Sequence, residues 1–218
     1  MHAIHDNDYD RLKKSGVKTM NLNFVVEYRD LSFDKKMSPL ILASFLGRIE
    51  CVKLMIENPY LDIDISSEDS GYTSLCVACL TGNYEIVKIL LDAGAEPNLP
   101  NKYYQTPLIL CFSRLNEESN VYENTKICFK MVELLLEYGG DINWIVDKNK
   151  GHTLLMQFCA VKLDLEEREK RINIEVIKFL IENGADKYMV SNKGKACFAL
   201  CAKHQNKEAV LEVLKNTN

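Results

Sequence analysis

Two short landmarks recur along this chain, and they constrain its fold more than any other feature. The first is a serine, threonine or alanine followed by an apolar run, at residues 38–41, 73–76, 106–109, 153–156 and 196–199. The second is an apolar pair followed within a few residues by glycine, at residues 90–96, 135–141 and 180–186. The ordered recurrence of both landmarks indicates a repeat architecture, in which each unit buries its apolar face against its neighbours.

The residues between the landmarks predict the structure of each unit. The apolar positions within residues 86–91 have helical spacing. Thr73 and its counterparts are expected to cap a first helix with their hydroxyl oxygen, and a following proline suits the first turn. Gly94, Gly139 and Gly184 are expected to stop the second helix in a left-handed conformation. Each unit is therefore predicted to run helix, turn, helix, glycine stop and extended loop.

These landmarks resemble the ankyrin repeat family, whose 33-residue unit opens with T-P-L-H and closes with L-L-x-x-G-A-D. The segment Gly71–Asn98 follows that pattern almost residue for residue, and the resemblance extends over about residues 34–216. It implies an all-α fold, namely an ankyrin-repeat solenoid of helix-turn-helix units joined by β-hairpin-like loops. One domain, residues 1–218, would then comprise units at about 1–36 (N-terminal cap), 37–70, 71–104, 105–150, 151–194 and 195–218 (C-terminal cap).

Two units carry insertions at the same turn, between their two helices. The first insertion, about Leu115–Ile127, is polar and is expected to be a tolerated loop, since longer loops cost little extra entropy to close. The second, about Lys162–Arg171, pairs Glu166 with Lys170 and Glu167 with Arg171. Acids four residues before bases support a helix, so a helical extension is expected there. A binding role for either insertion stays open.

The two ends are expected to be caps. Residues 3–12 are predicted to form a short helical hairpin, and residues 24–26 an extended stretch. A terminal repeat needs a polar outer face because nothing stacks on it. The last unit is accordingly expected to expose Lys203, Lys207, Glu208, Glu212 and Lys215.

Charge and hydropathy narrow the possible partners. The formal charge is −4, from 27 basic and 31 acidic residues, and the scattered basic residues argue against nucleic acid as a partner. The longest uncharged stretch, Ser70–Tyr84, is interrupted by polar residues and glycine, so no membrane insertion is expected. The start lacks a secretory signal, and the polar end Lys215–Asn218 is typical of a true terminus. We expect a monomer in the cytoplasm, with the nucleus as the alternative.

The eight cysteines are expected to be free thiols, because no feature points to an oxidising compartment. Cys76 and Cys79 have metal-ligand spacing, and Cys197 and Cys201 lie one helical turn apart, so a four-cysteine zinc site is the alternative. The repeat pattern instead places these residues in slots that take a small apolar side chain, which a free cysteine fills well. We therefore expect no metal and no cofactor.

No catalytic motif is recognisable. The sequence has no phosphate-binding glycine-rich loop, no G-x-S-x-G turn and no H-E-x-x-H helix. Its four histidines are His2, His5, His152 and His204. A cysteine nucleophile with a distant histidine is the enzymatic alternative that the sequence leaves open.

The resemblance also implies where a partner would bind. Ankyrin proteins bind through their hairpin tips and the outward side of the first helix of each unit. Mapped onto this chain, those positions give a predicted partner-binding set of Phe45, Leu46, Tyr72, Leu80, Tyr103, Tyr104, Arg114 and His152. Lys203 and His204 map to the same outward side in the last unit, whereas Leu42, Val77, Leu110 and Leu200 are expected in the core. Phe45, Leu46 and Leu80 are also compatible with local packing at helix ends.

The expected function is a non-enzymatic module that binds another protein through a concave face, as an adaptor, a scaffold or an inhibitor by occlusion. One alternative is a docking subunit or fragment of a larger enzyme or channel. A host-directed effector is a further role, and an enzyme with a cysteine–histidine site is the third class.

Overall fold

The computed structural model describes residues 2–27, 34–116, 121–160, 167–204 and 206–216. It divides into two compact units, Met1–Gly140 and Asp141–Asn218. The first unit contains α1 (His2–His5), α2 (Tyr9–Lys14), β1 (Val26–Glu27), β2 (Lys36–Met37), α3 (Pro39–Phe45), α4 (Ile49–Ile56), α5 (Ser74–Thr81), α6 (Tyr84–Asp92), α7 (Pro107–Cys111), the 3-10 helix η1 (Phe112–Asn116) and α8 (Val121–Glu137). The second contains β3 (Ile145–Asp147), β4 (His152–Thr153), α9 (Leu154–Cys159), α10 (Glu167–Glu182), α11 (Cys197–Leu200), the 3-10 helix η2 (Cys201–Lys203) and α12 (Lys207–Asn216).

The first helix of a repeat begins where the sequence predicts. The side-chain oxygens of three capping residues accept backbone hydrogen bonds: Ser38 from Ile41 at 3.3 Å, Thr73 from Cys76 at 3.2 Å and Thr153 from Met156 at 3.4 Å. Each bond satisfies one of the amides that a helix start leaves without a partner. Thr106 makes no such cap bond, and Pro107 begins its helix. The predicted caps are thus confirmed in three of the four repeats that carry serine or threonine there.

The second helix of a repeat ends at the predicted glycines. Gly94, Gly139 and Gly184 have φ values of 90°, 86° and 93°. After α6, the amides of Gly94 and Ala95 donate to the carbonyls of Leu91 and Leu90 at 2.9 and 3.0 Å. This pair of bonds closes the helix and is available only with a left-handed residue at the stop.

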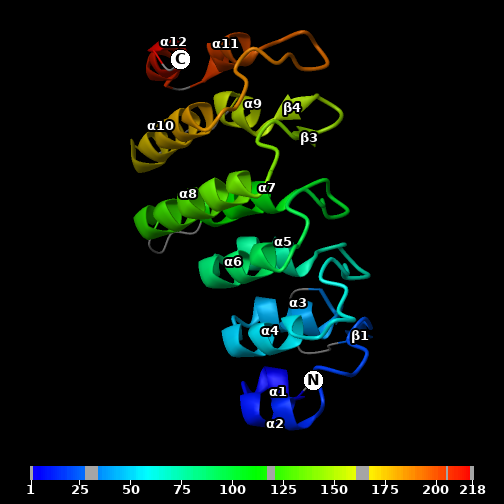
Figure 1. Cartoon of the computed structure of the whole chain (residues 1–218). Coiled ribbons are helices and arrows are strands. Elements are labelled where there is room, and N and C mark those ends of the chain that lie inside the picture. The colour runs from blue at the N-terminus through cyan, green and yellow to red at the C-terminus, as the bar shows by residue number, and fades with distance from the viewer. Residues whose placement is uncertain (1, 28–33, 117–120, 161–166, 205, 217–218) are drawn as a thin grey trace. The chain divides into compact units, whose positions relative to one another are not determined.

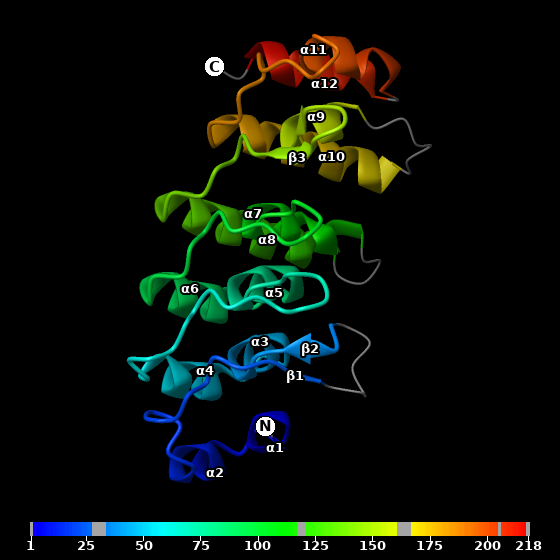
Figure 2. The ribbon, with the colours of Figure 1, turned by 90° about the vertical axis from the view of Figure 1, so that its right-hand side faces the viewer.

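In the first unit the helices form two layers. The first helices of the repeats, α3, α5 and α7, pack on one another, and the second helices, α4, α6 and α8, form the other layer. Figure 1 and Figure 2 show this order from two sides. Leu42, Val77 and Leu110 are fully buried between neighbouring repeats, as predicted. The predicted cap helices α1 and α2 are also present, and α1 contacts α3.

The second unit repeats the arrangement on a smaller scale. The first helices α9 and α11 pack together, and the second helices α10 and α12 do the same. The prediction for Leu200 was wrong: it is half-buried, because α11 has only four residues and ends at Leu200. Lys207, Glu208, Glu212 and Lys215 are exposed on α12, as predicted for a cap. The side chain of Lys203 lies outside the described residues.

The prediction that His204 faces outward was also wrong. The chain leaves η2 in an extended conformation at His204, and the ring turns inward until the residue is only 5% exposed. Its Nε2 lies 3.1 Å from Oδ1 of Asn173, and its Nδ1 accepts a hydrogen bond from the amide of Asn206 at 3.0 Å. Burial lowers the pKa of His204, so the ring is held neutral.

The insertions lengthen the second helices. α8 has 17 residues and α10 has 16, compared with nine in α6. The polar insertion at 115–127 is therefore not the loop that was predicted, because from Val121 it forms the first turns of α8 and buries Asn124 and Thr125. The helical extension predicted for the second insertion is confirmed from Glu167 onward. Residues 117–120 and 161–166 lie outside the described residues, so the predicted pair of Glu166 with Lys170 is not tested. The Glu167 side chain also lies outside the described residues.

Hydrogen bonds between neighbouring hairpins hold the repeats in register. β1 pairs with β2 in antiparallel fashion, Val26 opposite Met37, and β3 pairs with β4. Between repeats, the amide of Glu68 donates to the carbonyl of Lys36 at 3.1 Å, and the amide of Lys102 donates to that of Ser70 at 2.9 Å. These bonds position the side chains that the hairpin tips present.

A second set of links joins the loops that follow the second helices. The Asn23 side chain donates to the carbonyl of Tyr60 and accepts from the amide of Asp62, both at 2.7 Å. Asn143 makes the same two bonds in the second unit, to Gly184 and from Asp186, at 3.3 and 2.8 Å. Asp64 occupies the matching position between them and accepts from the amide of Glu96 at 3.1 Å.

No helix in the described part of the chain is long and apolar enough to cross a membrane.

Candidate protein-binding site

A cavity in the first unit brings together several predicted binding residues. It measures about 350 Å³ and is lined by Phe45, Leu80, Thr81, Ser113 and Arg114, which we call the inner groove. Phe45 comes from α3, Leu80 and Thr81 from α5, and the other two from η1. Three consecutive repeats therefore contribute to one surface.

The apolar side chains of the inner groove remain accessible because they lie at helix ends. Phe45 is the last residue of α3, and Leu80 lies in the last turn of α5. Both are half-buried, whereas Leu42 and Val77, one turn earlier, are fully buried. The core thus ends one turn before the groove begins.

Arg114 links two of the repeats that form the inner groove. Its Nη1 donates a hydrogen bond to the carbonyl of Thr81, at the end of α5. The guanidinium lies against Gly82, and a Cβ atom at that glycine would collide with it. Gly82 has a φ of 74°, which also favours a residue without a side chain. Arg114 therefore fixes the spacing of the repeats and brings positive charge to the rim of the groove.

The predicted tyrosines lie on the hairpin tips rather than in the groove. Tyr103 is 61% exposed and Tyr104 is 46% exposed, while Tyr72 is half-buried. Burial raises the pKa of the Tyr72 hydroxyl. Tyr104 has a φ of 62° and takes the left-handed position that Gly71 fills in the preceding hairpin. Leu46, half-buried after α3, is likewise not among the described residues that line the groove.

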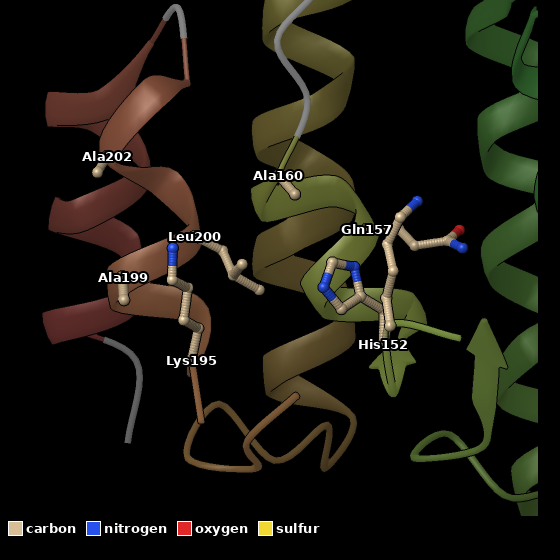
Figure 3. A pocket seen from close by; sticks show the side chains of 8 residues that line it. His152, Gln157, Ala160, Lys195, Ala199, Leu200 and Ala202 are labelled. Atoms are coloured by element: carbon tan, nitrogen blue, oxygen red, sulfur yellow. The ribbon is translucent and has the colours of Figure 1, made fainter. Parts of the chain in front are cut away.

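His152 belongs to a different cavity, in the second unit. This cavity measures about 500 Å³, and its described lining residues, which we call the basic pocket, are Lys150, His152, Gln157, Ala160, Lys195, Ala199, Leu200 and Ala202. Figure 3 shows the His152 ring and the Leu200 side chain reaching toward one another across it. Burial lowers the pKa of His152, and the nearby Lys150 ammonium lowers it further. Gln157, on α9, also lines this pocket and was not predicted from the sequence.

Comparison with known proteins identifies the type of repeat. Residues 1–101 match the sequence profile described as Ankyrin repeats (3 copies). The chain contains ankyrin repeats. It is 30% identical over 131 residues to a putative ankyrin repeat protein of Acanthamoeba polyphaga mimivirus, an alignment that covers 58% of this chain and 22% of that protein.

A second relative is much longer than this ankyrin chain. It is the transient receptor potential cation channel subfamily A member 1 of Homo sapiens, 27% identical over 154 residues, which cover 68% of this chain and 12% of the channel. The chain thus spans about a fifth or less of the length of these two curated relatives.

Solved structures show the same ankyrin fold. The ankyrin repeat domain of Bcl-3, a member of the IkappaB family, has a TM-score of 0.70 at 19% identity, covering 98% of this chain and 79% of that one. The ankyrin repeat protein EF0377 has a TM-score of 0.67 at 21% identity, covering 100% and 96%. The predicted all-α ankyrin fold is therefore confirmed.

The cysteines of this ankyrin chain are all buried as free thiols. Burial raises the pKa of Cys79 well above its ordinary value, and contact with Cys111 raises it further. Cys159 shares a thiol hydrogen bond with Cys197 that, together with burial, raises the pKa of Cys159. A nucleophilic or metal-binding cysteine needs the thiolate, which a raised pKa disfavours. The same hydrogen bond lowers the pKa of Cys197, whose side chain is fully buried. Among the described residues, no three histidine, cysteine or acidic side chains lie together as metal ligands.

Proposed function

We propose that this ankyrin chain is a non-enzymatic module that binds another protein at the inner groove and acts as an adaptor, a scaffold or an inhibitor by occlusion. The proposal requires no cofactor, metal or nucleic acid. It takes the chain as a monomer in the cytoplasm or nucleus.

One observation carries this proposal. Phe45 and Leu80 leave half-buried apolar surface beside a cavity of about 350 Å³, on repeats that Arg114 fastens together. Protein interfaces are enriched in aromatic residues and arginine, and a preformed pocket lowers the entropy cost of binding. An apolar side chain of the partner would enter between Phe45 and Leu80, and a partner carbonyl or carboxylate would face Arg114.

The test is a double substitution in the inner groove. A partner captured with the parent chain as bait is identified and purified, and its affinity is measured by calorimetry for the parent and for Phe45→Ser/Leu80→Ser. An anchor of this kind is worth about 2 kcal/mol or more on truncation. We therefore expect at least about 30-fold weaker binding.

The outer face of the first unit supplies a matched control. Tyr84 and Ile127, from α6 and α8, line a separate cavity of about 410 Å³ and are also at least partly exposed. Tyr84→Ser/Ile127→Ser removes a similar amount of apolar surface there. The proposal is refuted if the two double variants lose affinity equally. It is also refuted if Phe45→Ser/Leu80→Ser stays folded and loses no affinity.

A second candidate is the docking arm of a larger protein. It is supported by the lengths of the relatives, one of which is a cation channel. An immunoblot of the native protein separates the two: a band near 24.9 kDa supports a separate adaptor, and a much larger band supports a docking arm.

A further inference from the structure

The basic pocket of the second unit has a chemical character of its own. Lys150 and Lys195 contribute ammonium groups, and His152 and Gln157 contribute hydrogen-bonding groups, from two neighbouring hairpins and α9. None of the described residues that line it is acidic. The whole chain is net negative, at −4, so the pocket is a local exception to its charge.

The hairpins that form the pocket are firmly joined. The Asn192 amide donates to the carbonyl of Lys150 at 2.8 Å, and its side chain donates to those of Lys148 and Asn149 at 2.9 and 3.1 Å. A Cβ atom at Gly151 would collide with Asn192, so the two turns are in close contact. The amide of Lys195 donates to the Ser191 hydroxyl oxygen at 3.2 Å, which fixes the second turn. These bonds fix the backbone positions from which Lys150, His152 and Lys195 extend.

The polar groups of the pocket are available to a ligand. Within the part of the chain that the structure describes, the Lys195 ammonium, the His152 ring and the Gln157 amide make no hydrogen bond to another residue. Lys150 is different, because its Nζ lies 3.0 Å from the Asp147 carboxylate. Lys195, His152 and Gln157 therefore supply the donors, and Lys150 adds partly compensated positive charge.

We propose that the basic pocket accepts the carboxylate of a glutamate or aspartate side chain from an acidic peptide segment of a partner. The carboxylate would lie between Lys195 and His152, and charge-assisted hydrogen bonds of this kind are the stronger class. Ala160, Ala199 and Leu200 form an apolar wall that suits the methylene groups of glutamate. The volume of about 500 Å³ lies within the roughly 300–1,000 Å³ of typical ligand pockets.

This inference rests on the proposed function in one respect: both take a segment of another protein as the ligand. The inner groove and the basic pocket belong to different compact units and share no residue. An experiment can therefore contradict the proposal for one site and support the proposal for the other.

The experiment uses the full chain and a fluorescein-labelled oligoglutamate peptide, with binding followed by fluorescence anisotropy. Lys195→Gln is expected to weaken binding about tenfold or more, because it removes a charged hydrogen-bond donor. Lys193→Gln is the matched control, since Lys193 is exposed on the same turn but is not a lining residue. It should bind as the parent does, and an oligoglutamine peptide should not bind.

A second readout reports the site directly. In an NMR titration of the histidine ring signals, bound oligoglutamate should raise the pKa of His152, which faces Lys150 and Asp147 on its own hairpin and Lys195 on the next. His204, buried against Asn173, should not respond. This pKa shift distinguishes a docked carboxylate from a purely structural effect of Lys195.

The proposal is overturned if oligoglutamate leaves the His152 signals unchanged. It is equally overturned if Lys193→Gln weakens binding as much as Lys195→Gln. The Phe45→Ser/Leu80→Ser chain should still bind oligoglutamate as the parent does. If that variant loses partner binding and the parent chain does not bind oligoglutamate, the basic pocket is rejected and the inner groove is supported.

Discussion

Asp64 offers a test of how the repeats are joined. Among the described loop links at Asn23, Asp64, Asn98 and Asn143, it is the one acid. Asn23 and Asn143 each donate to one carbonyl and accept from one amide of the next repeat, and Asn98 donates to the carbonyl of Gly139 at 2.9 Å. An ionised Asp64 can accept from Glu96 but cannot donate to Gly94. We therefore expect Asp64→Asn to add a hydrogen bond that the chain now lacks.

The expected gain follows from one added bond. A net intramolecular hydrogen bond contributes about 0.5–1.5 kcal/mol to the free energy of unfolding. In a chain of this length, 1 kcal/mol moves the thermal midpoint by about 2–4 °C. Asp64→Asn should therefore raise the midpoint by about 1–6 °C at neutral pH, measured by circular dichroism.

The pKa of Asp64 predicts how the stability gained by Asp64→Asn depends on pH. Burial raises the pKa of Asp64, and the nearby Asp62 and Glu96 carboxylates raise it further. The folded chain therefore holds this proton more tightly than the unfolded chain, so Asp64 favours folding at low pH and this contribution is lost as the pH rises through the raised pKa. The gain from Asp64→Asn should be larger at pH 7 than at pH 3.

The control for this substitution is its neighbour. Asp62 accepts from the amide of Asp64 at 3.1 Å and is exposed, and asparagine keeps that acceptor. Asp62→Asn should change the midpoint little. A midpoint for Asp64→Asn that is unchanged or lower at pH 7, or a gain that is equal at both pH values, would refute the reasoning.

Three further predictions concern single features. Tyr104→Gly should stabilise the chain by about 1 kcal/mol in urea unfolding, because a left-handed residue with a side chain is strained; a loss of stability would show that the exposed ring packs. Burial lowers the pKa of His204, so the unfolded chain binds this proton at a higher pH than the folded chain does. The free energy of unfolding should therefore fall as the pH drops below about 6.5, and His204→Gln should flatten that dependence. A thiol reagent should label less than one cysteine per folded chain and all eight after denaturation, whereas rapid labelling of one native thiol would indicate a reactive site.

Local signals explain what the sequence could predict. The caps at Ser38 and Thr73 and the stop at Gly94 each depend on residues a few positions away, so a single repeat contains the information. The burial of Leu42 and Val77 was expected from the resemblance to ankyrin repeats. Repetition then confirmed each signal, because the same pattern occurred several times.

The misplaced residues depend on distant partners. His204 turns inward to meet Asn173, which no local pattern reveals. The short α11 ends at Leu200 and leaves its side chain half-buried, where full burial was expected. From Val121 the polar insertion is part of α8, where Asn124 and Thr125 are buried and the Asn124 side chain donates to the carbonyl of Arg114 at 3.5 Å. The basic pocket needs the alignment of two hairpins that Asn192 sets.

The central claim is that a partner binds at the inner groove, and methyl NMR of the chain titrated with its purified partner tests it most directly. The signals of Leu80, in the groove, and of Ile127, in the outer cavity, report the two faces of the first unit. The account predicts that the Leu80 methyl signals shift and saturate while the Ile127 signal stays unchanged. A saturating shift at Ile127 with no change at Leu80 would contradict it.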